Sequence, residues 1–184
     1  MTTPGARAAA GPAAGAPVID AHQHFWDLSA HDQHWLRGDP ALAPLLRNFS
    51  PADLAPLAAA GGVTATVAVQ TVSEPGETAE LLALAAGPGL VAGVVGWTDL
   101  TAPGVADVLA ALRELPGGDH LAGIRHPVLI EPDPDWLARP DVLRGLPPGR
   151  RSGLPTWSRT KVSWGSRVAA VTAAGRCRGS PTMS

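Results

Sequence analysis

The chain has little of several residue types, and each shortage excludes a class of protein. Among its 184 residues there is one cysteine, Cys177, so no disulfide can form within the chain. No run approaches the roughly 18 consecutive apolar residues that a membrane-spanning helix needs. The first sixteen residues also lack the apolar centre of a signal peptide. We therefore expect a cytoplasmic protein with no membrane partner and, for residues 1–16, which are rich in Ala, Gly and Pro, a flexible leader.

Acidic residues are missing from the last part of the chain. All 16 Asp and Glu residues lie between Asp20 and Asp141, whereas residues 147–184 hold seven of the 14 basic residues. Residues 1–146 therefore carry seven basic against 16 acidic residues, a formal charge of −9, and the remainder carries +7. The net charge of −2 is the sum of two unlike segments, and it predicts a change of character near residue 146.

The basic segment 147–184 allows three interpretations. Its basic residues, interleaved with Trp157 and Trp164, would suit nucleic-acid binding through phosphate neutralisation and base stacking. Its Gly, Pro, Ser and Arg content, with poor apolar periodicity, fits a disordered extension. Out-of-frame translation would explain why acidic residues and sequence pattern disappear together. We favour the third interpretation over the second and expect neither a packed domain nor a nucleic-acid partner.

Before residue 146, apolar runs alternate with helical patterns at regular spacing. Strands are predicted at 18–21, 63–70, 90–97 and 121–125. Helices are predicted from Pro51 to the Gly61-Gly62 pair, over 76–86, and along the stripe 105–115. Strands without polar alternation are typical of a parallel sheet covered on both faces. The first strand is also apolar enough to be buried.

This order of elements predicts an α/β fold. No Gly-x-Gly-x-x-Gly follows the first strand, which disfavours a dinucleotide-binding domain. A complete (β/α)₈ barrel needs about 250 residues. We therefore expect residues 17–146 to form the N-terminal half of a TIM-like (β/α)₈ barrel, truncated and with irregular termini. Its unpaired sheet edges would leave it marginally stable by itself.

Two histidines stand where the first predicted strand ends. His22 and His24 are separated by one residue, so their side chains project from the same face of a strand. Neutral imidazole is a common zinc ligand, and two ligands on one rigid element fix half of a coordination shell. We predict that both histidines bind a metal and act in catalysis, while a solvated surface pair is the alternative interpretation.

Several segments in order resemble a known family. They are 20–27 (DAHQHFWD), 69–70 (VQ) with 77–78 (ET), 94–100 (VVGWTDL), 123–126 (GIRH) and 131–137 (EPDPDWL). Together they resemble the amidohydrolase-related proteins, and among these the hydrolases of fuconolactone and rhamnonolactone. The resemblance covers roughly residues 17 to 146.

The resemblance implies a hydrolase that attacks a sugar lactone, or a similar cyclic ester, with an activated water. It implies a divalent metal, zinc being the first choice, although some related lactonases work without one. In such proteins a further histidine from a middle strand and an aspartate from the last strand complete the site, and neither is recognisable here. The alternative is a truncated or frameshifted relative without catalytic activity. The sequence leaves the oligomeric state open.

Candidate substrate-binding residues follow the other predicted strands. Barrel enzymes place their chemistry at the C-terminal ends of strands. The guanidinium of Arg125 suits a carboxylate or the lactone carbonyl, Gln70 a sugar hydroxyl, and His126 the orientation of substrate. Trp35, in the long loop after the first strand, would line the pocket. The alternatives are an ordinary salt bridge for Arg125 and loop packing or capping for the others. Glu77 is predicted to stabilise a helix dipole rather than contact substrate.

Overall fold

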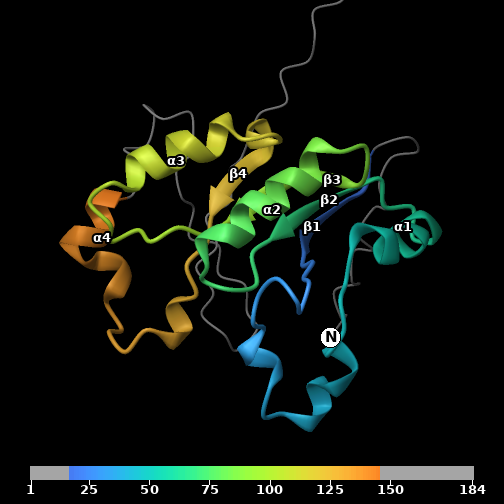
Figure 1. Ribbon diagram of the computed structural model, residues 1–184, viewed down its shortest axis with the longest axis horizontal. Helices are drawn as coiled ribbons and strands as arrows, with labels where there is room; N and C mark the ends of the chain where they lie inside the picture. The colour runs from blue at the N-terminus through green and yellow to red at the C-terminus, as the bar shows by residue number, and fades with distance from the viewer. Residues whose placement is uncertain (1–16, 146–184) are drawn as a thin grey trace, which may run out of the picture.

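The computed structural model describes residues 17–145, and these residues form a parallel sheet with helices beside it (Figure 1). The strands are β1 (Ile19–Gln23), β2 (Ala65–Val69), β3 (Val91–Gly96) and β4 (Leu121–Ile124), hydrogen-bonded in the order β1-β2-β3-β4. Every pairing is parallel, as predicted. The predicted leader 1–16 and the predicted basic segment 147–184 lie outside the described residues.

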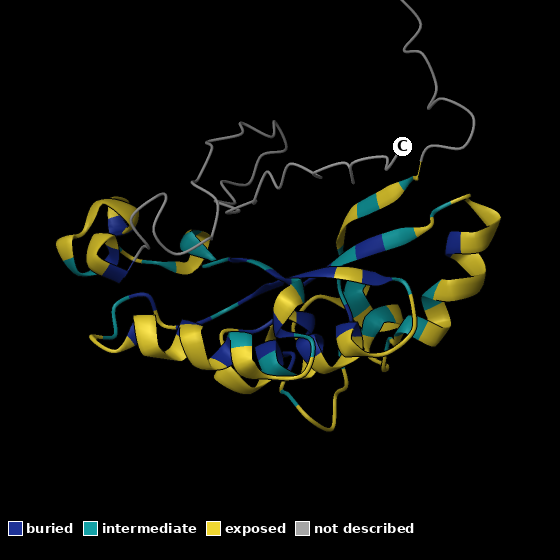
Figure 2. Cartoon of the chain, turned by 90° about the horizontal axis from the view of Figure 1, so that it is seen from above, coloured by how far each residue is buried: buried dark blue, intermediate teal, exposed yellow. Residues whose placement is uncertain are grey.

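The described residues contain four α-helices, one after each strand in the sequence. They are α1 (Pro51–Ala60), α2 (Pro75–Ala86), α3 (Val105–Glu114) and α4 (Pro140–Gly145). The helices lie mainly on one side of the sheet (Figure 2). Between α2, α3 and the strands lies an apolar core, which contains Ala68, Leu81, Leu82, Ala85, Val94, Val105, Leu109, Leu112 and Ile124. In the described part of the chain no helix is both long and apolar enough to cross a bilayer.

Local sequence explains where α1 begins and ends. The carboxylate of Asp53 accepts hydrogen bonds from the backbone N–H of Ser50 at 2.8 Å and from its hydroxyl at 2.6 Å. This contact satisfies groups that the first turn of a helix leaves free. At the other end, Gly62 adopts a φ of 69°, which glycine tolerates best. Gly61 keeps a φ of −85°, so only one glycine of the predicted pair takes the left-handed conformation.

Two predictions about burial are wrong. Strand β1 was predicted to be buried, yet its residues are exposed or half-buried, and Ile19 is 53% exposed. Strand β1 lies at an edge of the sheet, next to β2 alone, and helix α2 packs against β3 rather than against β1. The other edge strand, β4, is mostly buried. The predicted stripe 105–115 along α3 includes Val108 and Leu115, which are 41% and 38% exposed. The buried residues 105, 109 and 112 define a narrower face, and Val108 lies beside it.

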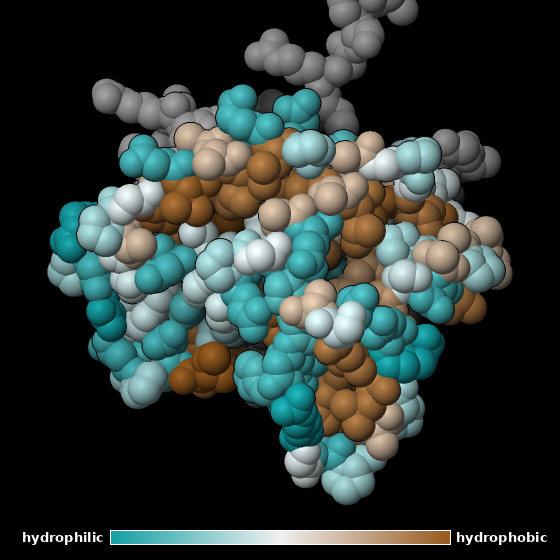
Figure 3. All heavy atoms as spheres, in the orientation of Figure 1, coloured by the Kyte–Doolittle hydropathy of each residue, from teal (hydrophilic) through white to brown (hydrophobic). Residues whose placement is uncertain are grey.

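Apolar side chains also remain on the surface. We call residues 24–49, between β1 and α1, the first loop; it contains two 3-10 helices, His34–Leu36 and Pro40–Leu45. Leu28, Trp35 and Leu46 are exposed there. Figure 3 shows hydrophobic surface over this loop as well as over the helical layer.

Candidate active site

Four of the predicted site residues lie at or near the C-terminal ends of the strands. His22 lies near the end of β1 and His24 just after it, Gln70 follows β2, and Arg125 follows β4. The C-terminal ends of parallel strands lie on the same side of a sheet, where barrel enzymes have their active sites. We call these four residues the strand-end group.

A hydrogen bond fixes which ring nitrogen of His24 carries the proton. The Nδ1 atom of His24 lies 2.9 Å from the carbonyl oxygen of Val69. A carbonyl can only accept, so Nδ1 carries the proton, and the Nε2 atom of a neutral ring keeps a lone pair. That Nε2 lies 3.1 Å from the Nε2 of His22. Both imidazoles therefore present the nitrogens that would face a shared ligand.

The surroundings favour the neutral form of both rings. Partial removal of the ring from water, followed by the positive charge of Arg125, lowers the pKa of His22, although the residue keeps an exposed surface. Burial is also the main cause that lowers the pKa of His24; the Val69 hydrogen bond opposes it, and the charges of His22 and Arg125 add to it. Neutral imidazole is the form that coordinates metals.

The pair fits part of a zinc shell. A tetrahedral zinc ion with Zn–N distances of about 2.0–2.1 Å separates two nitrogen ligands by about 3.3 Å. The observed separation of 3.1 Å is close to that value. Within residues 17–145, however, no group of three or more His, Cys, Asp or Glu side chains could hold a metal. The described residues thus offer two ligands.

Arg125 is a half-buried cation held by Gln70. Its Nη1 donates to the backbone carbonyl of Gln70 at 3.2 Å and to the side-chain Oε1 at 3.1 Å. Within residues 17–145 the buried Nε has no hydrogen-bond partner, and no carboxylate forms a salt bridge with the guanidinium. Burial lowers the pKa of Arg125, and the negative charge of Glu77 opposes that shift. The guanidinium keeps donors available for an anionic or carbonyl oxygen.

Gln70 and His126 are engaged within the chain. Gln70 is 1% exposed, and its Oε1 supports Arg125. The Nδ1 of His126 accepts from the indole N–H of Trp97 at 3.2 Å, and its Nε2 lies 2.6 Å from Glu131. The His126 ring also stacks on Trp136 with centroids 3.8 Å apart. Both ring nitrogens of His126 therefore have partners, and substrate contact by Gln70 or His126 stays a prediction.

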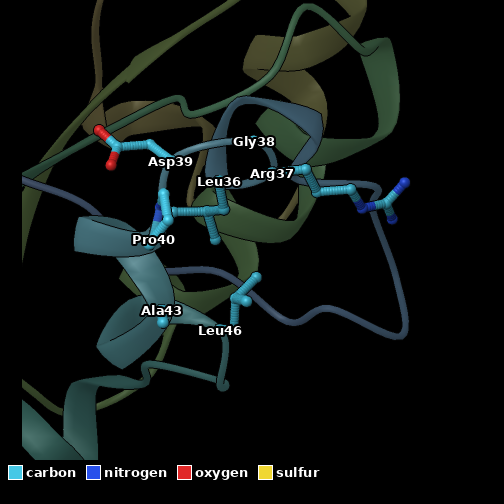
Figure 4. A pocket seen from close by; sticks show the side chains of 7 residues that line it. All are labelled: Leu36, Arg37, Gly38, Asp39, Pro40, Ala43 and Leu46. Carbon is cyan, nitrogen blue, oxygen red and sulfur yellow. The ribbon is translucent and has the colours of Figure 1, made fainter.

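Trp35 lies in the first loop rather than at a strand end. Its ring packs edge-on against Trp26 at 5.8 Å, and its indole N–H donates to Gln33 at 2.7 Å. A shallow hollow of about 400 Å³ lies in the same loop (Figure 4). It is lined by Leu36, Arg37, Gly38, Asp39, Pro40, Ala43 and Leu46, and none of the predicted site residues borders it. A role for Trp35 in substrate binding stays a prediction.

Two neighbouring residues at the start of α2 tie down the ends of two strands. Glu77 accepts hydrogen bonds from the residues after β2. The Thr78 hydroxyl accepts from the backbone N–H of Trp97 at 2.8 Å and donates to its carbonyl at 2.9 Å, just after β3. A Cβ on Gly96 would lie 2.3 Å from Thr78, so this close approach requires glycine. Sequence reasoning singled out the Glu77-Thr78 pair as a motif but missed these contacts.

Comparison with known proteins identifies the family of this chain. A family model described as Amidohydrolase matches residues 19–161, and the chain belongs to the amidohydrolase family. The match continues past residue 146, where the sequence pattern predicted that the resemblance ends. Two relatives are L-fucono-1,5-lactonases, one from Burkholderia ambifaria, 38% identical over 122 residues, and one from Burkholderia multivorans, 41% identical over 119 residues. They align with 66% and 65% of this chain, which spans 40% and 38% of their lengths.

Solved structures confirm the fold class. Two crystal structures of an amidohydrolase from Burkholderia multivorans, one with bound HEPES and one with bound Zn, match with TM-scores of 0.63 and 0.62. Their sequences are 38% and 37% identical to this chain, and each match covers 71% of this chain and 44% of the other. The predicted α/β fold, part of a TIM-like barrel, is thereby confirmed.

Proposed function

We propose that this chain forms part of the active site of a sugar-lactone hydrolase, with L-fucono-1,5-lactone as the type of substrate. The observation that carries the proposal is that two consecutive residues, Val69 and Gln70, hold the histidine pair and a guanidinium that forms no salt bridge within the described residues. Val69 holds His24, and Gln70 holds Arg125. The fuconolactonase relatives, 38% and 41% identical, support the choice of substrate.

The histidines and the arginine would have separate tasks. The Nε2 atoms of His22 and His24 would hold a divalent cation, proposed to be zinc, which supplies Lewis acidity when bound. In lactone hydrolysis the water oxygen bonds to the carbonyl carbon, the ring C–O bond breaks, and a hydroxy acid is released. Negative charge develops on the carbonyl oxygen, and Arg125 would stabilise that charge. Because Gln70 already holds its Nη1, the guanidinium needs little further ordering.

Hydrolysis by a longer chain tests this proposal. This chain would be continued beyond residue 146 with the corresponding C-terminal part of the Burkholderia multivorans relative, and acid release from L-fucono-1,5-lactone would be followed. We expect turnover well above the spontaneous rate. His22→Ala or Arg125→Ala should lower it about 10²-fold or more, as loss of a catalytic donor or ligand does.

His120→Ala is the matched control. His120 lies directly before β4, at the N-terminal ends of the strands. Within the described residues its side chain contacts only the Ala92 carbonyl by hydrogen bonding, so turnover should be unchanged. A folded, zinc-loaded continued chain without hydrolysis would contradict the proposal, and so would full turnover by His22→Ala.

A further inference from the structure

We infer that Glu77 is a positioning residue for Arg125. Its carboxylate fixes the turn after β2, and that turn fixes the two Gln70 oxygens that hold the guanidinium. The inference rests on the proposed role of Arg125 in lactone hydrolysis. It assigns to Glu77 a task beyond stabilising the dipole of α2.

The Glu77 carboxylate is buried and fully used by one short segment. The residue is 3% exposed. Its oxygens accept from the backbone N–H of Thr71 at 2.8 Å, from the backbone N–H of Val72 at 3.0 Å, and from the Thr71 hydroxyl. Burying a carboxylate is unfavourable unless hydrogen bonds compensate it, and all of these donors belong to residues 71–72. Through Glu77, helix α2 therefore anchors the backbone of the two residues directly after Gln70.

The anchored turn directly follows Gln70, the residue that holds Arg125. The Gln70 backbone N–H donates to the carbonyl of Val95 on β3 at 2.8 Å. Its carbonyl and its side-chain Oε1 both accept from Arg125. Residues 70–72 thus have their polar groups bound on three sides, by β3, by Arg125 and by Glu77. Loss of the hydrogen bonds to Glu77 would allow the turn to rotate, and the Gln70 oxygens would move with it.

Glu77 also acts on Arg125 through its charge. It is the negative charge that favours the cationic form of Arg125 against burial, although the two side chains form no salt bridge. A direct ion pair would occupy the guanidinium and compete with substrate. A carboxylate set behind the turn supports the cation and leaves its donors free. This indirect placement distinguishes a positioning residue from an ordinary ion-pair partner.

The first measurement uses the 184-residue chain and needs no activity. Amide hydrogen exchange at Thr71 and Val72 would be measured in Glu77→Gln, together with the NMR signal of the Arg125 Nε–H, assigned with Arg125→Lys. We expect exchange at both amides to accelerate about tenfold, the effect of losing one good hydrogen bond. The Arg125 signal should shift or broaden. Glu80→Gln is the matched control, because Glu80 lies three residues further along α2 with a 56% exposed side chain and pairs with His31.

The second measurement uses the continued chain described above. Glu77→Gln should lower kcat/KM for L-fucono-1,5-lactone about tenfold, and Glu77→Asp, which keeps the charge, should recover part of the loss. In the Arg125→Lys background Glu77→Gln should cause no further loss, because the two residues act as one unit.

Several results would overturn the inference. Unchanged exchange with an unchanged Arg125 signal in Glu77→Gln is one, and additive losses in the double variant are another. If Glu77→Gln does not fold, Thr71→Val removes only the hydroxyl contact and should shift the Arg125 signal in the same direction by a smaller amount. No shift in that variant would equally overturn it. Absence of hydrolysis in the continued chain would count against the proposed function only, since exchange and the Arg125 signal still decide the role of Glu77.

Discussion

Single residues at the strand ends owe their chemistry to particular neighbours. His24 has its Nδ1 proton fixed by the Val69 carbonyl, whereas His22 is exposed and has the His24 ring as its partner. The motif His-x-His predicts that two rings lie side by side. It cannot predict which nitrogen carries the proton, because the carbonyl that decides it lies 45 positions further along the chain.

Zinc binding is the prediction at this scale. Two neutral ligands on one strand end supply half of a tetrahedral shell, so the 184-residue chain should bind zinc weakly. His22→Ala or His24→Ala should abolish that binding in a calorimetric titration. His34→Ala, an exposed histidine of the first loop, is the control and should leave it unchanged. If the double variant lacking His22 and His24 bound zinc as tightly as the parent, the assignment would be wrong.

At the scale of elements, a histidine joins the first loop to α2. The Nδ1 of His31 lies 2.7 Å from Glu74, the residue that precedes α2, and its Nε2 lies 3.1 Å from Glu80. Burial alone would lower the pKa of His31, but the hydrogen bond with Glu74 and the charges of Glu80 and Glu74 outweigh burial and raise it. The contact is therefore strongest when His31 is protonated.

The stability of the chain should depend on pH through this contact. A raised pKa in the folded state means that the stabilisation is full below about pH 6.5 and is lost as pH rises through the folded pKa. Both carboxylates are exposed, so we expect less than about 1 kcal/mol. Urea unfolding at pH 6 and pH 8.5 should show a larger loss from His31→Asn at pH 6. His34→Asn should show no such difference, and an equal loss from His31→Asn at both pH values would refute the idea.

Sequence patterns predict the elements well and their surroundings poorly. The four strands and helices α1, α2 and α3 lie within about two residues of their predicted limits, because Gly and Pro mark most of the boundaries, whereas α4 was not predicted. The burial of Glu77 and the contact between Gln70 and Arg125 were not predictable. Both depend on how α2 packs over the strand ends and on the register of β2, β3 and β4, which no local pattern encodes. The exposure of β1 has the same origin, since an apolar run does not reveal whether a helix packs against its strand.

At the scale of the whole molecule, the described residues would hold one part of the proposed site. They contain four strands, and the chain spans about 40% of the length of its curated relatives. His22, His24 and Arg125 would supply a cation site and an oxyanion donor. No Asp or Glu of residues 17–145 joins the two histidines in a group of three that could hold a metal.

Activity of the 184-residue chain is the prediction at this scale. Each missing catalytic interaction can reduce the rate about 10²-fold or more, and an open pocket weakens the remaining electrostatic contacts. We expect little or no hydrolysis of L-fucono-1,5-lactone by this chain, measured as acid release beside the continued chain at equal concentration. Comparable turnover by the two would show that the 184 residues complete the site themselves.

The two carbonyls at the end of β2 have a consequence for how the site tolerates change. The carbonyls of Val69 and Gln70 belong to the main chain, so any amino acid at position 69 would offer His24 the same acceptor. The proton position on His24 is therefore protected against point substitution at its partner. Length is the sensitive variable instead, because one residue deleted from β2 would bring the Gln70 carbonyl, which now faces Arg125, to the place where the Val69 carbonyl faces His24. For this pair of contacts, the spacing of the backbone matters more than the identity of its side chains.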